Sequence, residues 1–207
     1  MTALCAAAAS LVSGSSRASD ETEAFIQRTV DQGYGILNST TLSDEERSKE
    51  FFDFMVSLTD IRRIALFTLG PYVNRASDAE IDEFVDAFTD YAVTVYEDRL
   101  SRYSGQSMRV TGSTDRAADD SVVSAVVYTP NEATSPSTRS LNVAFRVRED
   151  ANGNPIVIDM QAEGVWIAVN QRADFTSFLQ QNNGSLPALS NSLRRQVDQI
   201  RNNGATP

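Results

Sequence analysis

The sequence predicts an α+β fold, in which a curved four-stranded antiparallel sheet packs with helices on one of its faces. Three observations predict it. Apolar residues recur at helical spacing up to about residue 105, they alternate with a period of two from about 107 to 161, and helical spacing returns after Gly164. The 207 residues are enough for one domain with a sizeable core and few for two.

Capping residues and apolar periodicity predict the helices. Ser43 and Ser77 each precede a glutamate at the spacing of a capping box, and Thr59 or Asp60 can cap a short helix that ends at Gly70. We expect about five to seven helices, and the ranges that the pattern marks are 19–37, 43–55, 61–69, 77–105, 165–183 and 186–201.

Between the two helical regions the pattern is that of β-strands. The predicted strands are 107–110, 122–128, 141–148 and 156–161, with turn residues at Gly112, in residues 130–136 and in residues 152–155. The last connection fits a hairpin, so we expect neighbouring strands to be antiparallel. In the third strand Phe145 and Val147 alternate with Arg146 and Arg148, which predicts one buried and one polar face.

The composition excludes several classes of function. The net charge of −10 disfavours binding to nucleic acid and lasting adhesion to an anionic membrane surface. The chain has no histidine, which excludes Ser-His-Asp and Cys-His catalysis and every metal site that needs histidine. The single cysteine, Cys5, lies near the N-terminus, so we expect neither a disulfide nor a thiol nucleophile in the folded domain.

Residues 1–18 resemble a secretory signal peptide. The apolar run 4–12 is followed by small polar residues up to Ser19, although no basic residue precedes the run. The other interpretation is an alanine-rich tail, and a lipoprotein signal is rejected because the bulky Leu4 precedes Cys5. No run of about 18 apolar residues is present. We therefore expect an exported, soluble protein whose residues 19–207 form a single domain.

No catalytic site is recognisable among the polar residues. Asp115, Asp119 and Asp120 match no calcium loop and indicate a solvated hairpin, so we expect no metal and no cofactor. We expect the polar residues where the last strand meets the following helix to cap that helix or to form an ion pair. They lack the nucleophile and oxyanion donors that catalysis requires. These structural-junction residues are Asp159, Glu163, Gly164 and Arg172.

Large apolar side chains are abundant on elements that we expect to face one another. A closed core and an open ligand pocket give the same pattern in one dimension, so periodicity leaves both interpretations open. The candidate residues for an apolar pocket are Phe67, Leu69, Tyr72, Phe84, Phe88, Tyr91, Val95, Phe145, Met160, Val165, Ile167, Val169, Phe175 and Phe178.

Three blocks of the chain are distinctive in their residues and in the order in which they occur. The first runs from Thr59 to Asp78 and includes IALFTLGPY, the second is the predicted helix from Glu83 to Gly105, and the third includes DMQAEGV and NQRADF. Together they resemble the MlaC/toluene-tolerance family of periplasmic phospholipid-binding proteins. Trp166 and Gln171 stand where that family commonly has Ser and Tyr. The resemblance covers roughly residues 25–193.

The resemblance implies a non-enzymatic carrier of phospholipid in the periplasm of a Gram-negative envelope. Such a carrier exchanges lipid between an outer-membrane lipoprotein complex and an inner-membrane ABC transporter with its substrate-binding ring, and so maintains outer-membrane lipid asymmetry. We expect an NTF2-like/cystatin-like cone whose apolar pocket between helices and sheet holds phospholipid as cargo. Contact with the membrane itself is expected to be transient.

The residues alone do not exclude other functions. A carrier of another envelope lipid, such as a hopanoid, needs the same apolar surface, and the mass of the extracted ligand separates the two. A small enzyme on an α+β cone is a further alternative. The last is a structural partner of membrane complexes that holds no ligand.

Overall fold

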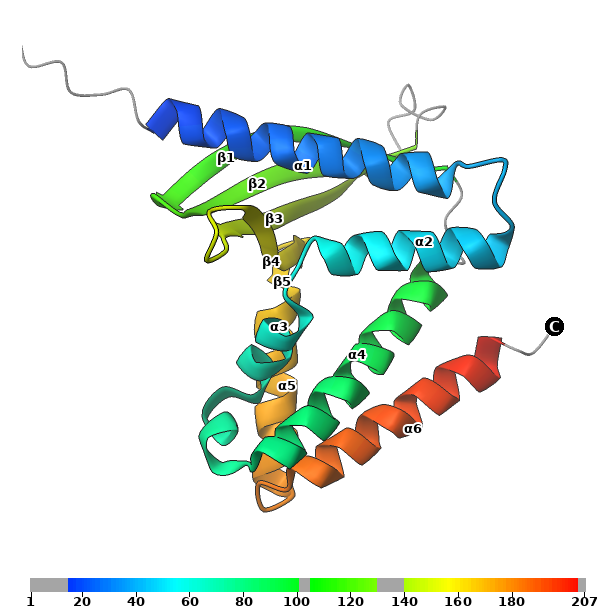
Figure 1. Cartoon of the computed structure of the whole chain (residues 1–207), viewed down its shortest axis with the longest axis vertical. Helices are drawn as coiled ribbons and strands as arrows, with labels where there is room; N and C mark the ends of the chain where they lie inside the picture. The colour runs from blue at the N-terminus through cyan, green and yellow to red at the C-terminus, as the bar shows by residue number, and fades with distance from the viewer. Residues whose placement is uncertain (1–14, 101–104, 130–139, 205–207) are drawn as a thin grey trace, which may run out of the picture.

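The computed structural model describes residues 15–100, 105–129 and 140–204 and has the predicted α+β organisation (Figure 1). Its helices are α1 Ser15–Leu37, α2 Asp44–Ser57, α3 Ile61–Leu69, the short 3₁₀ helix η1 Gly70–Arg75, α4 Asp78–Leu100, α5 Ile167–Gln181 and α6 Leu186–Gly204. The strands are β1 Ser107–Ala117, β2 Asp120–Tyr128, β3 Leu141–Glu149, β4 Pro155–Ala162 and β5 Val165–Trp166.

Three predictions fall partly or wholly outside the described residues. These are the predicted turn at 130–136, residues 1–14 of the predicted signal peptide and residues 101–104 of the predicted helix 77–105. Helix α1 begins at Ser15, four residues before the predicted start at Ser19. Within the described ranges no helix is both long and apolar enough to cross a membrane.

The two predicted capping boxes are present. The hydroxyl of Ser43 accepts the backbone N–H of Glu46 at 3.3 Å, and the Glu46 carboxylate accepts the N–H of Ser43 at 2.9 Å. Ser77 and Glu80 repeat this arrangement at 3.3 and 2.9 Å before α4. In both boxes the bonds to serine hold the glutamate pKa below its ordinary value. Each box satisfies backbone donors that a helix start leaves free, and so fixes where α2 and α4 begin.

The linker between α2 and α3 ties the helices to the sheet. Of the two predicted caps, Asp60 is the one that accepts the backbone N–H of Arg63, at 2.9 Å. Thr59 instead donates its hydroxyl to the carbonyl of Val157 at 2.6 Å, and the N–H of Val157 donates to the carbonyl of Leu58 at 2.9 Å. The start of α3 is therefore held against strand β4.

The sheet is an open antiparallel meander in the order β1-β2-β3-β4-β5, with one strand more than predicted. The sequence predicts that residues 165–166 start a helix, but they pair with Ala162 and Gln161 of β4. Glu163 and Gly164 have φ angles of 47° and 85°, which form a two-residue hairpin turn and reverse the chain. The helix therefore begins at Ile167, two residues later than predicted.

Strand β1 is longer than predicted because Gly112 is not a turn. The pairing with β2 shifts between Val110 and Gly112, so this glycine, at φ 150°, lies in a β-bulge and the strand continues to Ala117. The side chain of Gln27 on α1 accepts the backbone N–H of Val110 at 3.2 Å. Helix α1 thus satisfies a backbone donor of the edge strand beside the bulge.

One face of the sheet is apolar and the other polar, as predicted. Helix α1 lies across β1 and β2 (Figure 1). It packs on the apolar face in a group that we call the sheet core, which comprises Ile26, Val30, Val123 and Val147 with partly buried Phe25, Tyr34, Met108, Val110, Phe145 and Val157. Arg146, Arg148 and Asp120 lie at alternate register positions, on the opposite face.

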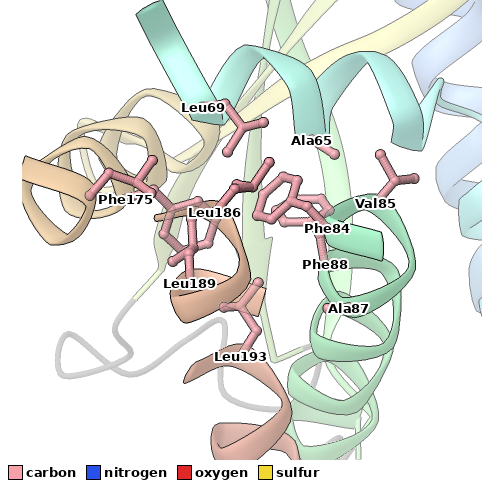
Figure 2. Close-up of a cluster of buried hydrophobic side chains, with 11 residues drawn as sticks. Ala65, Leu69, Phe84, Val85, Ala87, Phe88, Phe175, Leu186, Leu189 and Leu193 are labelled. Carbon is pink, nitrogen blue, oxygen red and sulfur yellow. The ribbon is translucent and has the colours of Figure 1, made fainter. Parts of the chain in front are cut away.

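A second hydrophobic group joins α3, α4, α5 and α6, and we call it the helical core. Its buried residues are Ala65, Leu69, Phe84, Val85, Ala87, Phe88, Phe175, Leu179, Leu186, Leu189 and Leu193. Phe84 and Phe88 meet the ring of Phe175 edge-on, with centroids 5.9 and 6.3 Å apart (Figure 2). The two cores share no residue, so the helices and the sheet are each packed around their own centre.

Candidate functional site

The predicted pocket residues fall into distinct groups in the structure. Half of them belong to the packed helical core or lie against it, namely Leu69, Tyr72, Phe84, Phe88, Tyr91, Phe175 and Phe178. Phe145 packs against the sheet core. Val95 and Met160 are half-buried and belong to neither core. The structure therefore does not bring the fourteen residues together around one space.

The remaining four residues are exposed, and we call them the apolar patch: Phe67, Val165, Ile167 and Val169. Their exposed fractions are 41%, 54%, 38% and 51%. Phe67 projects from α3 and Val169 from α5, and both line one cavity. Val165 and Ile167 lie on the β5–α5 segment within four residues of Val169. Phe67 and Val169 thus form an exposed apolar pair at this cavity, and an exposed apolar group of this kind is typical of a surface that contacts a ligand or a partner.

Asp159 caps α5 from the neighbouring strand, which is one of its two predicted roles. Its Oδ1 accepts the backbone N–H groups of Ala168 and Met160, both at 2.8 Å. Trp166, which precedes the helix, makes no side-chain capping bond, so Asp159 supplies the acceptor that α5 needs. Burial raises the pKa of Asp159 above its ordinary value, while the backbone N–H groups and the charge of Arg146 oppose that rise.

Glu163 and Arg172, two of the other junction residues, also have structural roles. The carboxylate of Glu163 accepts the backbone N–H of Asn142 at 2.6 Å and so fastens the β4–β5 turn to β3. The guanidinium of Arg172 lies over the ring of Phe67, 4.9 Å from its centroid, in cation–π geometry. Arg172 therefore covers one face of the Phe67 ring.

A cavity of about 210 Å³ opens where α3, β3, β4 and α5 meet beside the apolar patch. Its lining combines apolar side chains with three arginines and two aspartates: Thr59, Asp60, Arg63, Ile64, Phe67, Arg146, Arg148, Ile158, Asp159 and Val169. A wider and more open groove of about 580 Å³ adjoins it between α3 and the β3–β4 turn, and the two share Thr59, Asp60 and Arg63.

Two of the cavity arginines are anchored by the aspartates of the β1–β2 hairpin. Arg146 donates from Nε and Nη2 to the two carboxylate oxygens of Asp120, at 2.9 and 2.6 Å, and Arg148 pairs with Asp119. These bonds hold the pKa of both carboxyl groups below the ordinary value. The predicted solvated hairpin is thus an anchor for arginines. Among the described residues, no group of three or more acidic, cysteine or histidine side chains is placed to hold a metal ion.

Sequence reasoning did not single out the arginines of the cavity. Arg146 and Arg148 alternate with apolar residues of β3, and this spacing indicates that they share a face. Nothing in the spacing brings Arg63 to them, because α3 precedes β3 by more than 70 residues. The linker bonds between residues 58–59 and Val157 hold the start of α3 against the sheet, and so bring Arg63 to the cavity that Arg146 and Arg148 line.

The fold and the site define a class of protein, an α+β domain with an exposed apolar patch beside an arginine-lined cavity. The model of the MlaC protein family matches residues 27–195. This match covers most of the chain, so the protein belongs to the MlaC family. No protein with a curated description matches the sequence.

Seven chains among the solved structures match this one. One of them is a phospholipid-binding protein from Ralstonia solanacearum, determined in complex with a phospholipid. Its sequence is 20% identical, the superposition covers 86% of this chain and 98% of the other, and the TM-score is 0.70. At this identity the likeness establishes a shared fold.

Proposed function

We propose that this protein is a non-enzymatic carrier of phospholipid in the periplasm, which passes lipid between an outer-membrane lipoprotein complex and an inner-membrane ABC transporter. Membership of the MlaC family supports this function. The Ralstonia solanacearum protein of the same fold, which was determined with a phospholipid bound, supports the nature of the cargo.

The observation that carries the proposal is the exposure of the apolar patch. Burying one large aliphatic or aromatic side chain contributes about 1.5–3 kcal/mol, and two such side chains, Phe67 and Val169, line one cavity while they are 41% and 51% exposed. Single exposed apolar residues are ordinary, but a group of them indicates a surface that another apolar molecule covers. An acyl chain is such a molecule.

The energetics of lipid transfer require this kind of surface. An acyl chain that leaves a bilayer loses about 0.8 kcal/mol of favourable burial for each CH₂ group. A carrier must therefore offer apolar surface that replaces much of this burial, without binding so tightly that the lipid cannot leave. A surface that is already exposed meets both needs, because no packed core has to open before the lipid binds.

The proposal is tested by the lipid content of the purified protein. We expect native mass spectrometry and solvent extraction to detect phospholipid in the wild type. Val165→Asp and Val169→Asp should keep the wild-type circular dichroism spectrum and lose most of the bound lipid, because each places a charge in the patch. Phe88→Asp is unsuitable, since Phe88 is 6% exposed in the helical core and a charge there unfolds the protein.

Ala79→Asp is the matched control. Ala79 is exposed in the first turn of α4, outside the patch, so this variant adds the same charge and should retain lipid. The carrier function is contradicted if gentle preparations of the wild type contain no lipid and take none up from vesicles. An extracted ligand with the mass of another envelope lipid would keep the carrier and change its cargo.

A further inference from the structure

The arginine-lined cavity offers more hydrogen-bond donors than the protein satisfies. The Nε of Arg148 is buried, and among the described residues no acceptor bonds to it. A buried donor without an acceptor lowers stability, so an acceptor from outside the chain, such as a water molecule or a bound ion, would stabilise the fold at this point. The Nη2 atom of the same side chain donates to the carboxylate of Asp119.

The other two arginines add donors on the same cavity. Arg63 lies in the first turn of α3, is exposed, and forms no ion pair within the described ranges. Arg146 uses Nε and Nη2 on Asp120, so its bidentate pair does not engage Nη1. Three guanidinium groups from two elements therefore converge on one space.

The two carboxylates of the lining are already engaged by the protein. Asp60 accepts the backbone N–H of Arg63 as the cap of α3. Asp159 accepts two backbone N–H groups, and burial favours its protonated form. Neither carboxylate forms an ion pair with Arg63 or Arg148. Neither lining carboxylate therefore supplies the acceptor that Nε of Arg148 lacks.

We propose that this cavity binds a phosphate group, with Arg63, Arg146 and Arg148 as its donors. Guanidinium groups match the geometry of phosphate oxygens and pair with them strongly. Ile64, Phe67 and Val169 form an apolar wall beside these donors, so a phosphate ester with an apolar substituent fits the lining best. The site deepens the proposed function, on which it rests for the lipid headgroup as one source of the phosphate. A free phosphate ester is the other source.

The site is tested by isothermal titration of the full chain at constant ionic strength. The ligands are inorganic phosphate, glycerophosphoglycerol and a short-chain phosphatidylglycerol below its micelle concentration. We expect saturable binding that Arg63→Gln and Arg148→Gln each weaken about tenfold, the effect of losing one charged hydrogen bond. Arg194→Gln is the matched control, because it removes the same charge on α6, where Arg194 pairs with Glu83 at 2.8 Å, and it should bind as the wild type does.

The outcomes separate the two sources of phosphate. Tighter binding of phosphatidylglycerol than of glycerophosphoglycerol, with the same dependence on Arg63, identifies a headgroup site. Equal binding of the two identifies a site for free phosphate esters. If Arg148→Gln does not fold, Arg63→Gln decides alone, since Arg63 is exposed and forms no ion pair in the described part of the chain.

The site is overturned if none of the three ligands binds saturably, or if Arg63→Gln and Arg194→Gln weaken binding equally. This failure is distinct from failure of the carrier function. A protein that contains lipid but binds every ligand independently of Arg63 is a carrier without this phosphate site. A protein that binds phosphate through Arg63 but takes up no lipid has the site and is not a carrier.

Discussion

Gly70, which follows the last residue of α3, lies close against α5. Its φ of 56° lies in the left-handed region that side chains rarely adopt. A Cβ at this position would lie 3.0 Å from Cγ2 of Thr176 and 3.2 Å from Nε of Arg172. The absence of a side chain therefore permits both the backbone turn and the position of Arg172 over Phe67.

We predict that Gly70→Ala lowers the free energy of unfolding by about 1–3 kcal/mol, because the backbone strain and the contact with Thr176 act together. Gly35→Ala is the control. Gly35 lies inside α1, and a methyl group there would have no neighbouring atom within 4 Å, so alanine should stabilise the helix by about 0.5–1 kcal/mol. Urea denaturation measures both, and equal effects of the two substitutions would contradict the assignment.

Asp120 and Asp159 should give the stability opposite dependences on pH. The bonds from Arg146 lower the pKa of Asp120, so its stabilisation is present above the ordinary carboxyl value of 3.8 and is lost as the pH falls through its folded pKa. Burial raises the pKa of Asp159, so its ionisation costs stability, and this cost develops as the pH rises from 3.8 through its folded pKa.

We therefore expect Asp120→Asn to lower the free energy of unfolding at neutral pH, by about 2 kcal/mol, and to have less effect in acid. Asp159→Asn should remove the loss of stability above pH 3.8, since its amide oxygen can still accept the N–H of Ala168. Urea unfolding of the two variants and the wild type between pH 3 and 7 is the measurement. Parallel curves for all three proteins would show that neither carboxyl group has a shifted pKa.

At the scale of the element, the helix starts are set by a few local bonds. We predict that Ser43→Ala lowers the free energy of unfolding by about 1 kcal/mol, because the backbone N–H of Glu46 loses its acceptor at the start of α2. Ser48→Ala in the interior of the same helix is the control and should be neutral or stabilising. Chemical denaturation compares them, and a loss at Ser48 equal to that at Ser43 would argue against the cap.

Capped helices and strands long enough to show alternation could be predicted from the sequence, and the short strand β5, which depends on pairing alone, could not. Ser77 and Glu80 fix the start of α4 through bonds within four residues, and their spacing is visible in the chain. Strand β5 has two residues, and it exists because Glu163 and Gly164 turn the chain back onto β4. A strand this short shows no alternation of its own.

The same distinction applies to the candidate site. Asp159 could be predicted as a helix cap, because it lies just before the switch from strand to helix. The periodicity of Phe84 and Val169 could not separate a core residue from a surface one, although Phe84 is 0% and Val169 51% exposed. Which face of a helix meets another element depends on contacts between distant segments, such as α3 with α5.

At the scale of the whole molecule, the two separate cores bear on how a ligand binds. The helical core and the sheet core are joined near β4 and β5 by the bonds of Thr59 to Val157 and of Ala168 to Asp159. The apolar patch and the arginine-lined cavity lie at this junction. A ligand bound there contacts residues attached to both cores and should stabilise the molecule as a unit.

We therefore predict that phospholipid raises the thermal stability of the whole protein. At a free lipid concentration 100 times Kd, binding adds about 2.7 kcal/mol to the free energy of unfolding. For a chain of this size, roughly 2–4 °C per kcal/mol gives a rise in Tm of roughly 5–11 °C. Differential scanning calorimetry of lipid-loaded and lipid-depleted protein measures the shift.

Val165→Asp should unfold at a temperature that lipid does not change, while Ala79→Asp should respond as the wild type does. A loaded wild type, with its lipid verified by mass spectrometry, that unfolds at the temperature of the depleted protein would show that the lipid does not bind preferentially to the folded state.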